Sequence, residues 1–433
     1  MAGIKLVYIG GGSTRAPGTV AALVERGAAF AGSEIVLVDL DADRLDVVRR
    51  LAVRMAVVRG HDLRICATTD RRAALEDADV VLTSFRPGGF EGRVLDETIP
   101  LRHGVIGQET QGPGGFFMAL RSIAVMREIV EEMEARCPNG WLVNYTNPVN
   151  IVSEAITHHS NVRCVSLCEG PLTFPADVAR TAGLDPTRLE ATMVGLNHTG
   201  WSVRHDYAGA DLMPLIEEAA DRFGRPAIGV TRDDLMLGLA ATMGALPSAY
   251  LYYYYFHDHA LDAARAAART RAQEIMRHLD DYWTHYRDQA GAVDPHLDPA
   301  RSRGGILELE LAVDVIDAIV NDRGTTWPVN VPNRRTVLPG FPDDLVVEVP
   351  ARVSRGGIDP LPVPALPVHL RGLIEALGAY QAAAAEAGWS GSRRDGVRAL
   401  ASHPLVGTLP RAEAIYDEMA AAHRADLPAR LLA

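Results

Sequence analysis

The chain has 433 residues, of which 48% are hydrophobic and 23% charged, within the ordinary range of folded globular proteins. Its formal net charge of −12 and its lack of lysine and arginine runs argue against nucleic acid as a partner, because phosphate contacts need clustered cations. No segment reaches the roughly 18 apolar residues of a membrane span, and the N-terminus lacks a signal-peptide pattern. We therefore expect a cytoplasmic protein that has no membrane partner. Since single cores stop growing at roughly 250 to 300 residues, we also expect two domains.

The first 170 residues alternate between short apolar runs and longer stretches with apolar residues at helical spacing. Such runs predict buried strands, and the stretches between them predict helices. Six strands are expected, at residues 4–10, 34–39, 62–67, 79–85, 141–145 and 162–168. Strands that alternate with helices form a parallel sheet, so the pattern predicts an α/β fold with a Rossmann-type, doubly wound domain over residues 1–170.

After residue 170 the pattern becomes mostly helical. The apolar periodicity predicts helices at residues 233–245, 260–286 and 367–385, with a short strand near 345–349. We therefore expect a second, mixed α/β domain over residues 171–433.

A glycine turn lies between the first predicted strand and the first predicted helix. Its residues are Gly10, Gly11, Gly12, Ser13 and Thr14. A dinucleotide pyrophosphate binds backbone N–H groups at this place in a Rossmann-type fold, so the turn predicts NAD binding. A full GxGxxG motif would have glycine where this chain has Arg15, which leaves open a turn without a ligand. Asp39, at the end of the second strand, suits a ribose hydroxyl and favours NAD over NADP, although acidic residues are also common where helices start.

Residues 85–121 read FRPGGFEGRVLDETIPLRHGVIGQETQGPGGFFMALR and follow the fourth strand, at the edge where ligands bind in open α/β sheets. We expect a long connection here. Loops longer than about 12 to 15 residues are usually functional or disordered, and the interleaved apolar residues argue against disorder. The candidate ligand contacts in this segment are Arg86, Arg93, Gln108, Glu109 and Thr110, although any single one is better explained as a solvated loop residue.

Cys168 ends the sixth predicted strand in CVSLCEGP, and His198 follows in the polar segment GLNHTGW. The four cysteines show neither a disulfide spacing nor a CxxC motif, which favours free thiols in a reducing compartment. Thiolate and imidazole are ligands for transition-metal ions. Without further context, a buried cysteine that packs as a small apolar residue and a histidine that is hydrogen-bonded in a turn are the simpler interpretation.

Several motifs, taken in order, resemble glycoside hydrolase family 4. They are FRPGG, GQET, NYTNPV, VSLCEGP, GLNH, PSAYLYYYY and VNVPNRRTVLPGFPDDLVVEVPARV. The resemblance covers nearly the whole chain and is nearest to the 6-phospho-β-glucosidase branch. It implies a fold similar to lactate and malate dehydrogenases and a glycosidase that depends on NAD and a divalent metal, usually Mn(II). It also implies a homodimer or homotetramer, with the second domain contributing to substrate, metal and subunit contacts.

The mechanism implied by this resemblance is transient oxidation of the sugar. NAD accepts a hydride from C3, which makes the C2 proton acidic; a base removes this proton, and the group on C1 is eliminated. Water then adds and the hydride returns, so NAD is not consumed. A metal at the C2 and C3 oxygens stabilises the intermediate charge.

The resemblance also implies roles for individual residues. They are Cys168 and His198 as metal ligands, Tyr250 as the base that removes the C2 proton, and Arg93 and Asn147 as contacts to sugar hydroxyls. Glu109, in the GQET motif, is taken as a further substrate contact. A free phenol has a pKa near 10, so Tyr250 needs a metal or another positive charge nearby to act as a base.

Two positions depart from the family pattern. Glu169 follows the matched cysteine, at a position where relatives commonly carry asparagine or an aspartate that acts as a general acid. Its carboxyl group could protonate the leaving oxygen or bind substrate, or simply cap a helix. Tyr252 stands where many phospho-β-glucosidases have arginine, which weakens the case for a phosphorylated sugar. The resemblance as a whole still favours a 6-phospho-β-glucosidase. An unphosphorylated or α-linked glycoside, a 2-hydroxyacid dehydrogenase and an NAD-sensing binding protein remain alternatives.

Overall fold

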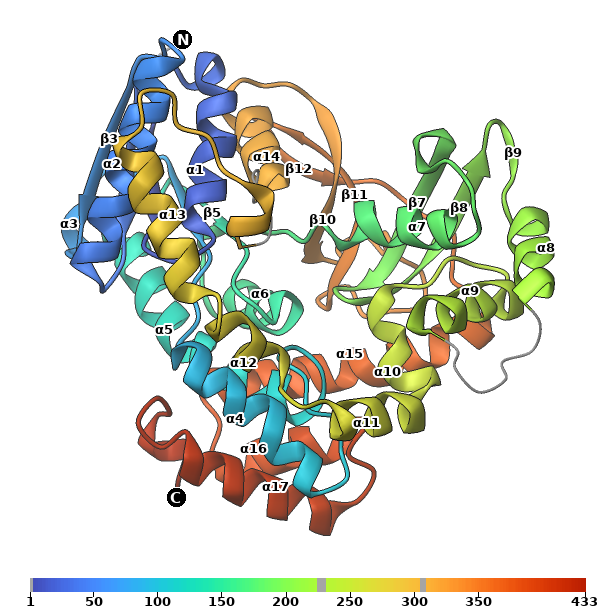
Figure 1. Ribbon diagram of the computed structural model, residues 1–433. Coiled ribbons are helices and arrows are strands. Elements are labelled where there is room, and N and C mark those ends of the chain that lie inside the picture. Colours follow the sequence, from blue (N-terminus) through green and yellow to red (C-terminus); the bar gives the residue numbers. More distant parts are fainter. Residues whose placement is uncertain (1–2, 224–230, 304–308) are drawn as a thin grey trace.

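Six parallel strands form the first half of a single large sheet in the computed structural model, which describes residues 3–223, 231–303 and 309–433 (Figure 1). They are β1 (Lys5–Ile9), β2 (Ser33–Val38), β3 (Leu63–Thr68), β4 (Val80–Thr83), β5 (Trp141–Asn144) and β6 (Arg163–Ser166). Their spatial order β3-β2-β1-β4-β5-β6 is that of a doubly wound dinucleotide-binding sheet. The predicted Rossmann-type sheet is therefore confirmed, and every strand end lies within two residues of its expected place.

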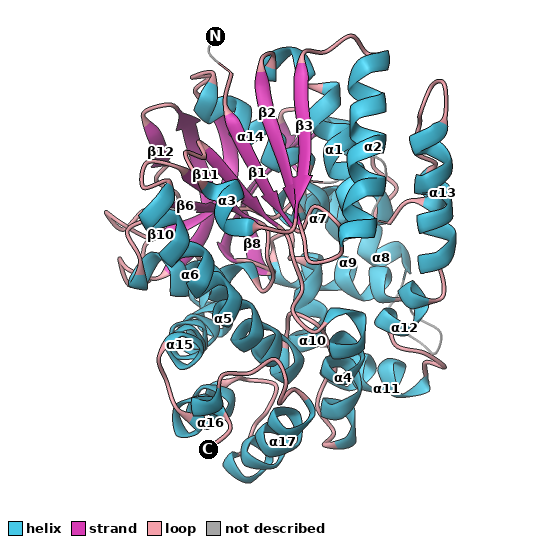
Figure 2. Cartoon of the chain, turned by 90° about the vertical axis from the view of Figure 1, so that its left-hand side faces the viewer, coloured by secondary structure: helices cyan, strands magenta, loops and turns pink. Residues whose placement is uncertain are grey.

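Helices cover both faces of this parallel sheet. They are α1 (Ala16–Glu25), α2 (Ala42–Val58), α3 (Arg71–Leu75), α5 (Gly112–Arg136) and α6 (Val149–His159). Figure 2 shows α1 and α2 on one side of the strands and α5 and α6 on the other. All four residues of β4 are buried, as expected for a strand that is covered on both faces.

The expectation of a long connection over residues 85–121 is wrong. Residues Gly89–Arg102 form helix α4, and α5 already begins at Gly112. Gly88 and Gly89 have φ of 80° and 63°, which L side chains rarely adopt, so these glycines make the turn into α4. Part of the charge that gave the segment its loop-like composition is buried: Arg93 and Glu97, four residues apart on α4, form a buried ion pair.

Beyond β6 the sheet continues with antiparallel strands. They are β7 (Leu189–Leu196), β8 (Thr199–Tyr207), β9 (Ala210–Asp211), β10 (Thr325–Pro332), β11 (Val346–Ser354) and β12 (Gly357–Pro360). β10 pairs with β6, and the order continues through β11, β7, β8 and β9. The mixed α/β character of this part is confirmed, and β11 contains all but the first residue of the strand expected near 345–349. Because one sheet passes through both parts, the division at residue 170 stays a prediction.

The helices of the second part pack against both this antiparallel extension and the helices of the first part. They are α7 (Gly170–Thr181), α8 (Met213–Phe223), α9 (Arg232–Met243), α10 (Tyr252–Tyr255), α11 (His257–Ala266), α12 (Arg271–Met276), α13 (Leu279–Gly291), α14 (Glu310–Val320), α15 (Val368–Trp389), α16 (Arg393–Ser402) and α17 (Leu409–Ala422). Residues 260–286 are mostly helical, as expected, but they are divided among α11, α12 and α13, and a capping box of Thr270 and Gln273 starts α12. Among the described residues, no helix is long and apolar enough to cross a membrane.

Alanine at Gly10 is expected to destabilise the fold. Gly10 has a φ of 102°, and a Cβ atom there would lie 2.1 Å from the backbone oxygen of Ser84. Because backbone cannot move aside as a side chain can, we expect a loss of about 1 to 3 kcal/mol in the free energy of unfolding. Gly238, in α9, has open space around its Cβ position, so alanine there is expected to stabilise by about 0.5 to 1 kcal/mol. Thermal denaturation measures the stability of both variants. If both alanine substitutions changed the stability in the same direction, the close approach of the Ser84 backbone to Gly10 would be contradicted.

Candidate active site

The predicted site residues gather at the carboxyl edge of the parallel strands. The segments that follow β1, β4, β5 and β6 all reach this edge, because the strands run in the same direction. Open α/β sheets bind their ligands here. The β7–β8 hairpin belongs to the antiparallel extension and brings further residues to the same place.

His198 lies in a two-residue turn, not in the polar loop expected from GLNHTGW. Leu196 pairs with Thr199 across the hairpin, so only Asn197 and His198 connect β7 to β8. His198 is buried and has a φ of 69°, an uncommon value for a residue other than glycine. A hydrogen bond between Thr110 Oγ1 and His198 Nδ1 (3.1 Å) orients the imidazole ring. Such local strain, held in place by surrounding contacts, is typical of functional sites.

Tyr250 stacks on the imidazole of His198. The ring centroids are 3.9 Å apart and the ring planes differ by 5°. Tyr250 belongs to a short 3₁₀ turn, Ala249–Leu251, that Ser248 caps by accepting a hydrogen bond from the backbone N–H of Tyr250. Burial, followed by the charges of Glu109 and Cys168, raises the pKa of Tyr250 above its usual value. The phenol therefore needs a nearby cation if it is to act as a base.

Cys168 lies two residues beyond the end of β6 and close to the same pair of rings. Its Sγ accepts a hydrogen bond from the backbone N–H of Gly170 (3.4 Å), and the side chain of Asn197 also hydrogen-bonds to it. Burial, followed by the charge of Glu348, raises the pKa of Cys168 to about 12. A thiol in such surroundings becomes a thiolate at neutral pH only beside a cation such as a metal ion.

Cys168 and His198 fit a metal ion chemically. Burial lowers the pKa of His198 to about 4, which keeps the imidazole neutral, as a metal ligand must be. Its Nδ1 is engaged by Thr110, which leaves Nε2 as the coordinating atom. Over the part of the chain that the structure describes, no three or more His, Cys, Asp or Glu side chains are grouped to hold a metal. A metal at this pair would have positions left for substrate oxygens and water.

Glu348 is a site residue that the sequence did not reveal. It is buried on β11 and accepts hydrogen bonds from the side-chain amides of Asn197 (3.1 Å) and Asn330 (3.0 Å). Burial raises the pKa of Glu348 to about 7. By holding Asn197, it fixes the residue that precedes His198 in the turn. A lone acidic residue inside the apolar run LVVEVP was the one available signal.

A cluster of arginines surrounds Glu109. Its carboxylate forms ion pairs with Arg86 and with Arg93, whose Nη1 lies 2.9 Å away. Burial alone would raise the pKa of Glu109, but the charges of Arg86, Arg93, Arg15 and Arg303 outweigh this effect and lower the pKa to about 2. Burial and the other arginines also lower the pKa of Arg303 to about 9. Among the described residues, positive charge is therefore in excess here even though Glu97 also pairs with Arg93, and an anion would be stabilised.

The remaining candidates of this segment have structural contacts. Gln108 Oε1 accepts hydrogen bonds from the backbone N–H groups of Thr110 (2.6 Å) and Gln111 (2.7 Å), so its amide supports the chain ahead of α5. Thr110 orients His198, as described above. Of the five predicted contacts in this segment, Arg86, Arg93 and Glu109 thus meet in one cluster, and the other two shape the chain around it.

The glycine turn fits a dinucleotide phosphate. The hydroxyl of Ser13 is buried and has no hydrogen-bond partner among the described residues, and no side chain from this part of the chain caps the N-terminus of α1. A buried hydroxyl that lacks a partner and an uncapped helix N-terminus can each bind an anionic group. Asp39 accepts hydrogen bonds from the backbone N–H groups of Gly12 (2.9 Å) and Leu40 (2.7 Å), and a carboxylate keeps further lone pairs for a ribose hydroxyl. Thr14 links the turn to the arginine cluster, because Arg303 donates to its hydroxyl (3.3 Å).

Asn147 and Glu169 lie at the ends of two neighbouring strands. The side-chain oxygen of Asn147, three residues after β5, is buried and has no partner in the described part of the chain, which fits a contact that a ligand would complete. Glu169 is the N-cap residue of α7, but its side chain makes no capping hydrogen bond. Its charge contributes to the raised pKa of Cys168, so it lies near the thiol.

Tyr252 stands where an arginine was expected from the family pattern, yet a guanidinium group is nearby. Arg232, at the start of α9, lies over the Tyr252 ring at 4.9 Å and over the Tyr253 ring at 5.7 Å. The hydroxyl of Tyr252 is hydrogen-bonded to His259 Nδ1 (2.7 Å). No sequence signal pointed to Arg232, because it is distant in the chain from every motif except PSAYLYYYY.

Solved structures that are similar to this chain fall into two groups. A 6-phospho-alpha-glucosidase from gut microorganisms, in complex with NAD and Mn²⁺, has a TM-score of 0.85 at 26% identity and covers 98% of this chain and 99% of that one. A Thermotoga maritima 6-phospho-beta glucosidase, with NAD and glucose-6-phosphate, has a TM-score of 0.84 at 26% identity and the same coverage. A lactate dehydrogenase from Cryptosporidium parvum, with a TM-score of 0.54 at 14% identity, shares the fold alone.

Sequence comparisons cover nearly the whole chain. A protein of Bacillus subtilis (strain 168) named "Probable 6-phospho-beta-glucosidase" is 36% identical over 438 residues, which cover 98% of each chain. Residues 5–184 match the family model described as family 4 glycosyl hydrolase, and residues 193–406 match the model of its C-terminal domain. The first match contains all six parallel strands, and the second contains most of the antiparallel extension. The chain therefore belongs to family 4 of the glycosyl hydrolases.

Proposed function

We propose that this glycosyl hydrolase cleaves 6-phosphorylated glucosides with the help of NAD and a divalent metal ion, and that it prefers the β linkage. The observation that carries the proposal is the arginine cluster around Glu109. Four guanidinium groups act on the Glu109 carboxylate, and even when Arg93 is counted as neutralised by Glu97, the described side chains keep an excess of positive charge, which favours a phosphate group. Thr110, the next residue after Glu109, contacts His198, so the cluster adjoins the predicted metal ligands.

The relatives support both parts of the substrate proposal. Their names pair phosphorylated glucosides with the α and the β linkage, and the 36% identical relative carries the β name. The objection raised by Tyr252 is answered in part by Arg232, which brings a guanidinium group to the same place. An assembly of two or four subunits in the cytoplasm remains our expectation for this family.

The residues present fit both cofactors. We assign NAD to the glycine turn, with Ser13 near a phosphate and Asp39 near a ribose, and the metal to Cys168 and His198. When bound, NAD supplies a hydride acceptor for sugar C3, and the metal supplies a Lewis acid for oxygens that become negatively charged. Solved relatives contain NAD and Mn²⁺.

Side chains of the protein itself carry out the remaining chemical steps. We assign removal of the C2 proton to Tyr250, whose ring is held in place by stacking on His198. Arg232 favours the phenolate, because its charge acts to lower the pKa of Tyr250 against the effect of burial. Glu169 delivers a proton to the leaving oxygen, and Arg93 and Asn147 hold sugar hydroxyls in the orientation that the base requires.

Four p-nitrophenyl glucosides test the proposal: the α and β anomers, each with and without a 6-phosphate, in Mn(II), NAD and a reductant. We expect hydrolysis of the phosphorylated β compound alone. Hydrolysis of the phosphorylated α compound alone would correct the linkage. Activity restricted to the unphosphorylated compounds would overturn the role of the arginine cluster. Consumption of NAD with a 2-hydroxy acid, without glycoside hydrolysis, would favour the dehydrogenase alternative.

A further inference from the structure

The two predicted metal ligands belong to different parts of the sheet. Cys168 follows β6, the last parallel strand, whereas His198 lies in the turn between β7 and β8. Strands β10 and β11 lie between β6 and β7 in the spatial order of the sheet. The separation of the two ligands therefore depends on contacts that run across these two strands.

One row of paired residues crosses β10 and β11. Asn330 on β10 pairs with Ser166 on β6 and with Glu348 on β11. Glu348 pairs in turn with Gly195 on β7. In the described part of the chain, this row holds the single paired position between β6 and β10 and the single one between β11 and β7. The row thus joins the parallel half of the sheet to its antiparallel extension.

Side chains around this row converge on the carboxylate of Glu348. Its Oε1 accepts hydrogen bonds from Nδ2 of Asn330 (3.0 Å) and from Nδ2 of Asn197 (3.1 Å). The side chain of Asn197 also hydrogen-bonds to Cys168, and Asn197 precedes His198 in the chain. Asn330 therefore anchors the carboxylate to the sheet, and Asn197 connects it to both predicted metal ligands.

The two asparagine amides depend on Glu348 for their orientation. Glu348 is 6% exposed, and Asn197 and Asn330 are 2% and 1% exposed. The side-chain oxygens of both asparagines are buried without a hydrogen-bond partner among the described residues. Leaving a buried amide donor without an acceptor is costly as well. Without the carboxylate, the Asn197 side chain would turn toward another acceptor, and its contact with Cys168 would be lost.

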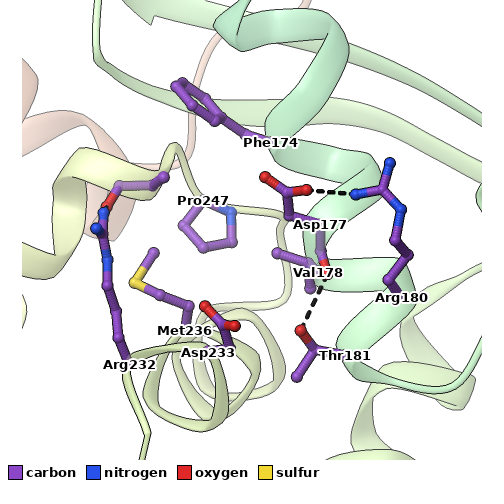
Figure 3. A pocket seen from close by; sticks show the side chains of 10 residues that line it. Phe174, Asp177, Val178, Arg180, Thr181, Arg232, Asp233, Met236 and Pro247 are labelled. Carbon is purple, nitrogen blue, oxygen red and sulfur yellow. Dashed lines mark hydrogen bonds and ion pairs between the residues drawn. The ribbon is translucent and has the colours of Figure 1, made fainter. Parts of the chain in front are cut away.

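The acidic residues of a neighbouring pocket are placed differently. This pocket of about 410 Å³ lies between α7 and α9, and Asp177 and Asp233 line it (Figure 3). Both carboxylates are exposed, and Asp177 is paired with Arg180 at the surface. Exposed ion pairs contribute little to a fixed geometry, because water competes for both partners. Glu348 differs from them because it is buried within the sheet and does not line the pocket.

We propose that Glu348 is a positioning residue of the metal site, which acts through Asn197 to hold Cys168 and His198 in the arrangement that binds a divalent ion. The inference rests on the proposed function, because it assumes that these two residues hold the metal. Groups that hydrogen-bond to metal ligands from behind orient them, and their loss commonly weakens metal binding by about 10- to 100-fold. A carboxylate with a purely structural role would change the melting temperature without changing the affinity for the metal.

Glu348→Met tests the proposal, because methionine has a similar length but lacks a strong hydrogen-bond acceptor. Mn(II) is titrated into the NAD-loaded protein, and the electron paramagnetic resonance signal of free Mn(II) gives the Kd. We expect the Kd to rise by at least about tenfold. Glu348→Gln keeps an oxygen that can accept from Asn197, so this variant should bind Mn(II) nearly as well as the wild type.

Asn197→Ala tests the route by which Glu348 acts. We expect this variant to raise the Kd for Mn(II) as Glu348→Met does, because it removes the side chain that connects the carboxylate to Cys168. The double variant should bind Mn(II) no more weakly than Asn197→Ala alone. Such non-additivity is expected when one residue acts through the other.

Glu154→Met is the matched control. Glu154 is a second buried carboxylate beside β11, and it accepts hydrogen bonds from the backbone N–H of Val346 (2.7 Å) and from the amide of Gln381 (2.7 Å). Among the described residues, it makes no hydrogen bond to Cys168 or His198. Its replacement should lower the melting temperature and leave the Kd for Mn(II) unchanged.

Four results would overturn the role of Glu348. They are wild-type affinity in Glu348→Met, equally weak binding by Glu348→Gln, wild-type affinity in Asn197→Ala, and multiplied effects in the double variant. If Glu348→Met does not fold, Glu348→Gln and Asn197→Ala still decide the question. If the wild type binds no Mn(II), or if Cys168→Ser binds it as well as the wild type, the metal assignment within the proposed function fails instead.

Discussion

Replacement of Cys168 by serine is expected to abolish metal-dependent hydrolysis, with a loss of about 10³-fold or more in kcat/KM. A serine hydroxyl stays neutral where a metal would turn the thiol into a thiolate, so one of the two protein ligands is lost. NAD binding should remain close to that of the wild type, because the glycine turn lies at a different strand end. Activity measured over a Mn(II) titration, together with NAD binding by calorimetry, separates the two effects.

Cys164→Ser is the control for this experiment. Cys164 lies on β6 four residues before Cys168, and burial raises its pKa to about 12 as well. Its thiol is in contact with the hydroxyl of Ser166 and not with the predicted catalytic groups. Serine should therefore be tolerated there with little loss of activity. If Cys168→Ser kept its Mn(II)-dependent activity, the ligand assignment would have to be abandoned.

Tyr250→Phe is expected to lose exchange of the C2 proton with solvent and to lower kcat by about 10²- to 10⁴-fold, as removal of a general base commonly does. Phenylalanine keeps the ring that stacks on His198, so the geometry of the imidazole should be retained. Incubation in D₂O followed by mass spectrometry of the sugar measures deuterium incorporation at C2.

Tyr255→Phe is a suitable comparison for the loss of a phenol. The Tyr255 ring packs edge-on against Trp201, with the centroids 5.8 Å apart, and it does not contact His198. This variant should incorporate deuterium at the wild-type rate. Wild-type incorporation by Tyr250→Phe itself would assign proton removal to another group.

The parallel half of the fold was predictable because its signals are local. Each buried strand is a short apolar run, and each turn is marked by glycine or by a change in periodicity, as at Gly10. Helix α4 was missed for a physical reason: Arg93 and Glu97 neutralise each other in the interior, and from sequence alone such charges look solvated. The hairpin at His198 was missed because its tight turn contains no glycine.

The candidate site was predictable only in part. Cys168, His198 and Tyr250 were named from the family resemblance, and the structure brings them together through the stacked rings and the contacts of Asn197. The partners of Glu109 were harder to predict from the sequence, because Arg15 and Arg303 are separated from each other by most of the chain. Long-range electrostatic groups of this kind arise from the tertiary fold, and no local pattern in the sequence encodes them.

The pairing of β6 with β10 has a consequence for how the chain is made. During synthesis, β6 is complete at residue 166, whereas its neighbour β10 ends at residue 332 of 433. Until then, the nascent N-terminal half would expose β6 as a bare strand edge, which is a template for pairing with other chains. Ribosome-bound intermediates of this length therefore carry an unpaired edge at β6. Fragments that end near residue 184 should aggregate instead of folding alone.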